Sequence, residues 1–203
     1  MSVTISGSSG IASVDGSAGS PSVRGTDANS GILYTSDAIK FSTGGTQRAV
    51  IDNNGLSSTG HIIQIQEGKT NSRTHVSSSD FQATNLNCSI TPVSSSNKVL
   101  VQVSGDCNTN GDDNEIALTV YRSIDSGTYT NLGNGTYGFV TARSDAARLH
   151  SAVSIQFFDS PGTTDSINYK VYMKRAGGSN GNVEFPVNNG WQYAFMHLSE
   201  VVA

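Results

Sequence analysis

Ile167-Asn168-Tyr169-Lys170-Val171-Tyr172-Met173-Lys174 is the stretch of the sequence that most clearly indicates the fold. Apolar side chains occupy every second position of this stretch, and mostly polar side chains stand between them. This period of two residues is typical of a β-strand that buries one face and exposes the other. The same alternation returns at Val99, Val101 and Val103, and almost no segment shows the helical period of 3.6 residues. The sequence therefore predicts an all-β protein.

Longer runs of this kind follow His61 and are separated by clusters of Ser, Gly, Asn and Asp, which favour turns. We expect strands at Ile62–Gln66, Ala83–Ile90, Lys98–Ser104, Glu115–Arg122, Phe139–Ala142, Ala152–Phe158, Ile167–Lys174 and Gln192–Ser199. Eight strands in this length of chain predict a β-sandwich of jelly-roll type over residues 61–203.

Residues 1–60 have a different texture, being rich in Ser and Gly with small apolar islands. The islands are Val3-Thr4-Ile5, Ile32-Leu33-Tyr34, Ala38-Ile39-Lys40-Phe41 and Ala49-Val50-Ile51, and Gly44-Gly45 predicts a hairpin between the last two. Such islands bury too little surface to order the segment, because each ordered residue costs about 1–2 kcal/mol of backbone entropy. We therefore expect other copies of the chain to support residues 1–60.

The final expected strand is apolar on both faces, with Trp191, Tyr193 and Phe195 on one face and Ala194, Met196 and Leu198 on the other. A strand of this kind is buried on both faces. One interpretation is a subunit interface formed by Trp191, Tyr193, Phe195, Met196 and Leu198, and the other is a central strand in a thicker monomeric core.

Composition and charge exclude several classes of protein. Only 14% of the 203 residues are charged and the net charge is −4, so the chain lacks the basic character of nucleic-acid-binding proteins. No apolar run approaches the roughly 18–20 residues of a membrane-spanning helix, and the first residues do not resemble a signal peptide. Cys88 and Cys107 would not face each other in a hairpin closed through Ser94–Asn97, so we expect two free thiols and synthesis in a reducing cytoplasm.

No recognisable catalytic motif is present, and we expect a protein that is not an enzyme. Gly44-Gly45 lacks the Lys and Ser/Thr of a phosphate-binding loop. No Gly-x-Ser-x-Gly motif stands in the strand–turn–helix context that a nucleophile elbow needs. The four histidines lack the spacing of a zinc site. Most aspartates fall in turns, and the sequence does not bring two of them to the ~5–9 Å separation that glycoside hydrolysis needs.

Two loops suggest binding chemistry. Asp106, Asn108 and Asn110, followed by Gly111, match the first part of a calcium loop, although Ala117 stands where the closing Glu belongs. An Asx-rich hairpin loop without calcium is the alternative. The loop Ser126–Gly138 is long and polar, and its residues Tyr129, Asn131, Asn134 and Tyr137 suit the stacking and hydrogen bonding of sugars. The alternative is a strand connection whose tyrosines fold onto the core.

Several motifs resemble fibre proteins of tailed bacteriophages, especially those of aquatic and cyanobacterial hosts. The N-terminal motifs are Ile5–Ile11, Asp15–Ala18, Ser20–Ile32, Ala38–Arg48 and Ile51–Gly55. The C-terminal motifs, which resemble the distal domain of the same group, are Thr91-Pro92, Ser94–Leu100, Val120–Arg122, Phe158–Thr164, Tyr169–Tyr172 and Leu198–Val201.

This resemblance implies a homotrimeric tail fibre in the virion, made in the host cytoplasm. Residues 1–60 would anchor the chain to a tail or baseplate protein and form a short shaft, and residues 61–203 would bind a host-surface receptor, expected to be a glycan. A head fibre or capsid decoration protein is the first alternative. Another alternative is a polysaccharide-degrading tailspike, which usually has a long β-helical body. The last alternative is a cellular carbohydrate-binding module, which normally has a signal peptide and neighbouring domains.

Overall fold

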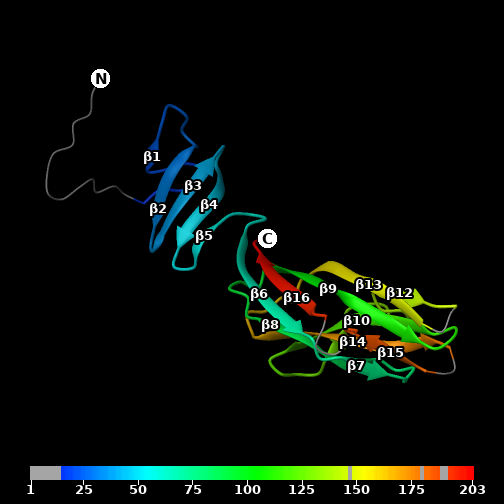
Figure 1. Cartoon of the computed structure of the whole chain (residues 1–203). Coiled ribbons are helices and arrows are strands. Elements are labelled where there is room, and N and C mark those ends of the chain that lie inside the picture. The colour runs from blue at the N-terminus through cyan, green and yellow to red at the C-terminus, as the bar shows by residue number, and fades with distance from the viewer. Residues whose placement is uncertain (1–14, 146–147, 179–180, 188–191) are drawn as a thin grey trace. The chain divides into compact units, whose positions relative to one another are not determined.

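The computed structural model describes residues 15–145, 148–178, 181–187 and 192–203, which form antiparallel β-sheets (Figure 1). The expected all-β fold is confirmed. The chain divides into two compact units, one comprising residues 1–63 with Val202 and the other residues 64–201 with Ala203.

The first unit contains one five-stranded sheet in which each strand pairs with the next along the chain. Its strands are β1 (Val23–Arg24), β2 (Gly31–Thr35), β3 (Ala38–Thr43), β4 (Thr46–Asp52) and β5 (Gly55–Ser57). Gly44 and Gly45 join β3 to β4 with φ values of 58° and 75°, as a two-residue hairpin turn requires. The hairpin predicted at this position is therefore present.

The second unit is a β-sandwich of two sheets around one core. The first sheet has the order β11 (Thr130–Asn131), β10 (Glu115–Ile124), β14 (Ile167–Gly177) and β8 (Gln82–Ile90), with β12 (Val140–Arg143) also pairing with β10. The second sheet has the order β6 (Ile62–Thr70), β16 (Ala194–Val201), β9 (Lys98–Asn110), β15 (Asn182–Phe185) and β7 (Thr74–Val76), with β13 (Arg148–Asp159) also pairing with β9.

The side chains that the period-two alternation predicts to be buried do face the core. Ile167, Tyr169, Val171 and Met173 of β14 have no exposed surface, and the valines at 99, 101 and 103 of β9 face the same core. All eight strands expected after His61 are present. The structure adds the short strands β7, β11 and β15, which were not expected.

Two local arrangements that were considered from the sequence do not form. The hairpin considered between Ala83–Ile90 and Lys98–Ser104 does not form, because β8 pairs with β14 in the first sheet and β9 belongs to the second. Cys88 and Cys107 are nevertheless free, and both are buried. The calcium-type loop at Asp106–Asn110 is also absent, because these residues continue β9 and pair with Arg148–Ala152 of β13.

Candidate functional site

An aromatic cluster covers the outer face of the first sandwich sheet. It consists of Phe81, Tyr121, Tyr129 and Tyr172, and we call it the aromatic face. Tyr172 reaches this face because it lies between Val171 and Met173, which both point into the core. Tyr121 of β10 pairs with Lys170 of β14, which lies on the same face of that strand as Tyr172. Because paired positions point to the same side of a sheet, Tyr121 also lies on the outer face.

The four rings contact one another in a continuous chain. Tyr121 and Tyr172 stack with their ring centroids 4.0 Å apart and their planes inclined by 27°. Phe81 meets Tyr121 edge-on at 6.3 Å, and Tyr129 lies 6.0 Å from Tyr172. Burial raises the pKa of Tyr121 and of Tyr172, so both hydroxyl groups are protonated and available for hydrogen bonds at neutral pH.

Two lysines flank the aromatic face. The Nζ atom of Lys170 lies 5.5 Å from the centre of the Tyr129 ring, and that of Lys174 lies 4.7 Å from the centre of the Phe81 ring. Such cation–π contacts are worth about 0.5–1 kcal/mol at exposed sites, so they orient the lysines without holding them strongly. Tyr129 and Phe81 therefore each lie beside a lysine ammonium group, which can donate hydrogen bonds.

Tyr129 also lines a polar hollow next to the aromatic face. The hollow has a volume of about 360 Å³ and is lined by Ser89, Ser123, Ser126, Tyr129, Ser166 and Asn168. The Tyr129 hydroxyl donates to Oδ1 of Asn168 at 2.7 Å, and Nδ2 of Asn168 donates to Oγ of Ser89 at 2.8 Å. Hydroxyl and amide groups offer both donors and acceptors, as recognition of sugar hydroxyls requires.

The turn at the edge of the hollow has an uncommon backbone. Asp125 and Ser126 have positive φ values of 48° and 59°, a conformation that residues other than Gly adopt infrequently. Two backbone hydrogen bonds hold this turn, one from the Asp125 amide to the Ser166 carbonyl and one from the Gly127 amide to the Ile124 carbonyl. The turn places Ser126 at the hollow rather than in the continuation of β10.

The four receptor-binding residues expected from the sequence do not form one site. Tyr129 lines the hollow and precedes Thr130, which pairs with Arg122 of β10. Tyr137 lies beside a different part of β10, because the amide of the nearby Phe139 donates to the Leu118 carbonyl. Four residues along a strand correspond to about 13 Å. The two tyrosines therefore lie at separate places on the sheet.

The two asparagines of the loop have structural roles. Oδ1 of Asn131 accepts hydrogen bonds from the Thr119 hydroxyl at 2.6 Å and from the Gly133 amide at 3.0 Å. Oδ1 of Asn134 accepts from the amides of Thr136 and Tyr137, at 2.8 and 3.0 Å. Both asparagines stabilise turns of the loop, which is a common use of this side chain.

No sequence pattern considered above indicated that Phe81, Tyr121 and Tyr172 belong to the site. A signal was present, because Tyr172 alternates with the buried residues of its strand and so belongs to the outer face. What the sequence could not supply is the pairing of β10 with β14, which brings Tyr121 beside it.

The residues expected at a subunit interface divide into two groups. Met196 and Leu198 have no exposed surface and already pack in the sandwich core. Phe195 lies on the opposite face of β16 and is half-buried, and Tyr193 is 49% exposed. Trp191 lies outside the described residues. A contact of Tyr193 and Phe195 with another subunit stays a prediction.

The expected metal ligands serve the protein's own structure. Asn108 is fully buried, donates through Nδ2 to Oε2 of Glu184 at 3.2 Å and accepts from Nε of Arg148 at 3.2 Å. Asp106 accepts from the Val187 amide at 3.4 Å, and burial raises its pKa. In the described parts of the chain, no three His, Cys, Asp or Glu side chains lie close enough together to hold a metal ion.

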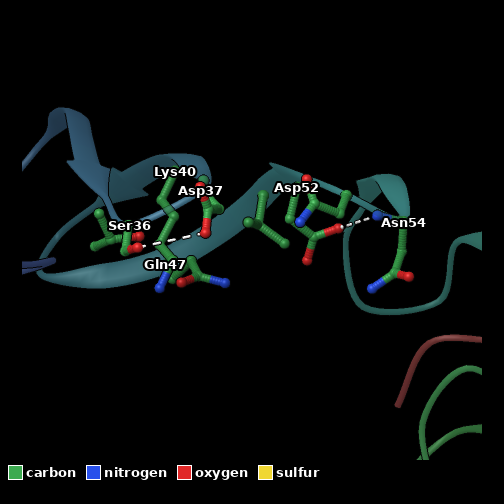
Figure 2. A pocket seen from close by; sticks show the side chains of 10 residues that line it. Ser36, Asp37, Lys40, Gln47, Asp52 and Asn54 are labelled. Atoms are coloured by element: carbon green, nitrogen blue, oxygen red, sulfur yellow. Dashed lines mark hydrogen bonds between the residues drawn. The ribbon is translucent and has the colours of Figure 1, made fainter.

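A second hollow of about 360 Å³ lies on the five-stranded sheet (Figure 2). Its lining includes Lys40 of β3 and Gln47 and Asp52 of β4. Oδ1 of Asp52 accepts from the Asn54 amide at 2.8 Å, and Oδ2 of Asp37 accepts from the Ser36 hydroxyl at 3.4 Å. These carboxylates therefore stabilise the adjoining turns, and the hollow marks the polar side of this sheet.

The described residues contain no helix that is long and apolar enough to cross a membrane. No family model matches the chain, and no curated protein matches it. Among solved structures, the chain is similar to that of the Gx strain of infectious bursal disease virus, with 10% identity, a TM-score of 0.34, and coverage of 87% of this chain and 47% of the other. A structure of the Gt strain of the same virus shows 12% identity, a TM-score of 0.34, and coverage of 82% and 48%, respectively. The chain thus spans about half the length of the solved structures it matches.

Proposed function

We propose that this chain is a structural protein of a virus particle, of the fibre type, which binds a glycan on the host surface through the aromatic face and the adjoining polar hollow. The observation that carries the binding role is the position of Tyr129. Its ring belongs to the aromatic face, and its hydroxyl bonds to Asn168 in the hollow. One side chain thus joins a stacking surface to a set of hydroxyl and amide groups.

This combination suits a sugar. The C–H face of a pyranose ring is apolar and stacks on an aromatic ring, whereas its hydroxyl groups need donors and acceptors in fixed directions. Ser89 and Asn168 provide both kinds of group in the hollow, already oriented by the hydrogen bond between them. Such preorganisation lowers the entropy cost of binding.

The hollow favours binding over catalysis. Its lining consists of serines, one tyrosine and one asparagine, with no carboxyl group among them. A glycosidase of the usual type needs two carboxyl groups on either side of the scissile bond. We therefore propose a receptor-binding role without hydrolysis of the glycan.

The placement on a virus particle rests on the sequence resemblance to tailed-phage fibres described above. In this proposal the first unit anchors the protein to a tail or baseplate protein, and the jelly-roll-like sandwich contacts the host. The same chain at the head, as a head fibre or decoration protein, is the second candidate, and localisation of the protein on particles by labelled antibody distinguishes the two.

The test of the binding role compares two tyrosines of one loop. Tyr129→Ala removes the ring and the hydroxyl from the site, whereas Tyr137→Ala removes a 55% exposed side chain that does not line the hollow. Loss of one aromatic contact and one hydrogen bond is worth about 2 kcal/mol, or about 30-fold in affinity. We expect this loss in adsorption to host cells or to purified envelope glycan for Tyr129→Ala and unchanged binding for Tyr137→Ala. Unchanged binding by folded Tyr129→Ala would refute the proposed site.

A further inference from the structure

The five-stranded sheet of the first unit carries apolar side chains on one face. Strand pairing aligns them in two rows across the sheet, because residues at paired positions point to the same side. The first row is Val23, Ile32, Phe41 and Ala49, and the second is Tyr34, Ile39, Ile51 and Leu56. We call these eight residues the apolar face.

The apolar face is open in the single chain. Its six largest exposed side chains are between 37% and 53% exposed: Val23 50%, Tyr34 38%, Ile39 39%, Phe41 37%, Ile51 42% and Leu56 53%. The opposite face of the sheet contains the buried residues Leu33 and Ser42 and the polar hollow of Figure 2. This arrangement is the reverse of an ordinary one-sided sheet, in which the apolar face is covered.

The exposed area is close to what an association surface needs. At roughly 80 Å² for each of the six side chains, the apolar face presents about 480 Å² of apolar surface. Packing of two such faces would bury about 900–1,000 Å² of apolar surface before any surrounding polar groups are counted. A specific interface buries about 1,200–2,000 Å² in total, so two apolar faces would supply about half of one or more.

We propose that the apolar face packs against the same face of a second copy of this chain. None of the eight residues is charged, so two identical faces meet without repulsion between like charges. Arg48 adjoins Ala49 of the face in the sequence, and its Nε donates to the Thr43 hydroxyl at 2.9 Å. Obligate interfaces between copies have this composition, with an apolar centre and polar groups around it.

A second copy is also the occupant that the fold of this unit requires. A sheet with one apolar face needs a second layer, and the described part of the unit contains a single sheet. Every copy has the same uncovered face, so copies of the chain supply one another's missing layer in equal numbers. This inference concerns a different unit from the glycan site and stands or falls independently of it.

The first test introduces one positive charge on either face of β4. Ile51→Lys places a charge in the apolar face, and Gln47→Lys places the same charge on the polar side of the same strand, where Gln47 pairs with Ser42. We expect the full chain to associate at micromolar concentration in sedimentation velocity experiments. Ile51→Lys should raise the dissociation constant at least 100-fold, and Gln47→Lys should leave it within about threefold. A monomeric parent chain, or equal effects of the two variants, would overturn the proposal.

The second test leaves the interface intact and measures its accessibility. Ala49→Cys places a thiol in the apolar face, and Gln47→Cys places one on the polar side of the same strand. The native thiols are buried, so they contribute little background. A maleimide reagent should label Cys at position 49 at least tenfold more slowly than Cys at position 47 in concentrated protein, and the difference should disappear on dilution. Equal labelling at all concentrations would mean that the face is open, and protection that persists on dilution would mean that it is covered within one chain. Either result would overturn the proposal.

Discussion

Asp159 connects the two sheets of the sandwich, and its removal is the sharpest test of how the sandwich is held together. Its carboxylate lies at the end of β13 in the second sheet. It accepts two hydrogen bonds of 2.8 Å from one guanidinium nitrogen of Arg122 and one of 2.7 Å from the Tyr169 hydroxyl, and both donors belong to the first sheet. Burial, and then the hydrogen bond to Asp159, raise the pKa of Tyr169, so the hydroxyl remains a donor throughout the physiological range.

The cost of Asp159→Ala follows from what each donor loses. The Tyr169 side chain is fully buried and can find no water, and an unsatisfied buried donor costs about 1–3 kcal/mol. The Arg122 side chain is 21% exposed, so water replaces some of the hydrogen bonding that it loses with Asp159. We therefore assign the loss of the Arg122–Asp159 ion pair a cost of about 2 kcal/mol. The sum of about 3–5 kcal/mol is a large share of the 5–15 kcal/mol that stabilises a typical domain.

Tyr169→Phe is the matched control. It removes the hydroxyl alone, leaves the pair of Arg122 and Asp159 in place, and should lower the free energy of unfolding by about 1 kcal/mol. We expect urea denaturation followed by circular dichroism to show these two losses, and the melting temperature of Asp159→Ala to fall by about 10 °C. A loss below 1 kcal/mol for Asp159→Ala would refute the reasoning, because it would mean that the two donors do not depend on this carboxylate.

Two further predictions concern other buried groups of the sandwich. Burial, and next the charge of Asp106, raise the pKa of Cys107 from 9.0 to about 12, so this thiol should resist iodoacetamide at pH 8 until the protein unfolds, as mass spectrometry of digests can measure. Because the thiol is protonated in the folded state, its contribution to stability should be complete below about pH 9 and decline as the pH rises towards 12. Glu200 is fully buried and accepts from the Val93 amide at 2.9 Å and from Asn97 at 2.7 Å, so Glu200→Ala should cost about 2–4 kcal/mol in chemical denaturation, with Glu200→Gln costing less.

The strands of the sandwich could be predicted from the sequence because their alternation extends over many residues. In Ile167–Lys174 the pattern repeats often enough to fix which side chains are buried, and the core confirms it. The strands β7, β11 and β15 are two to four residues long and cannot display a period. Their partners lie far away in the sequence, as the pairing of Val183 with Val76 shows, so only the tertiary structure defines them.

The polar end of β9 shows where local composition misleads. Asp106, Asn108 and Asn110 have the composition of a loop, yet they pair with β13 throughout. The strand is stable because Asn108 finds partners on neighbouring strands in the buried Glu184 and in Arg148. A buried polar group costs little when such partners exist, and partners from distant segments cannot be seen in the local sequence.

The candidate site was predictable only in part, for a related reason. Tyr129 could be selected because it lies in a long polar loop, where binding residues are frequent. Tyr121 and Tyr172 lie on strands, and their side of the sheet was expected to be ordinary solvent-exposed surface. Their stacking at 4.0 Å depends on the register between β10 and β14, which the sequence does not reveal.

The two proposals complement each other energetically. A glycan offers little apolar area, so a single site built on Tyr129 and its hollow should bind weakly. Association through the apolar face would place at least two such sites in one assembly, and multivalency can raise avidity by about 10²–10⁴ without any new contact to the receptor. The division of the chain into two units permits this combination. The sandwich completes its own core and can hold a preformed site, whereas the five-stranded sheet has an exposed apolar face, which we propose that another copy covers. Weak recognition by each chain and strong attachment by the assembly are therefore compatible properties of the same sequence.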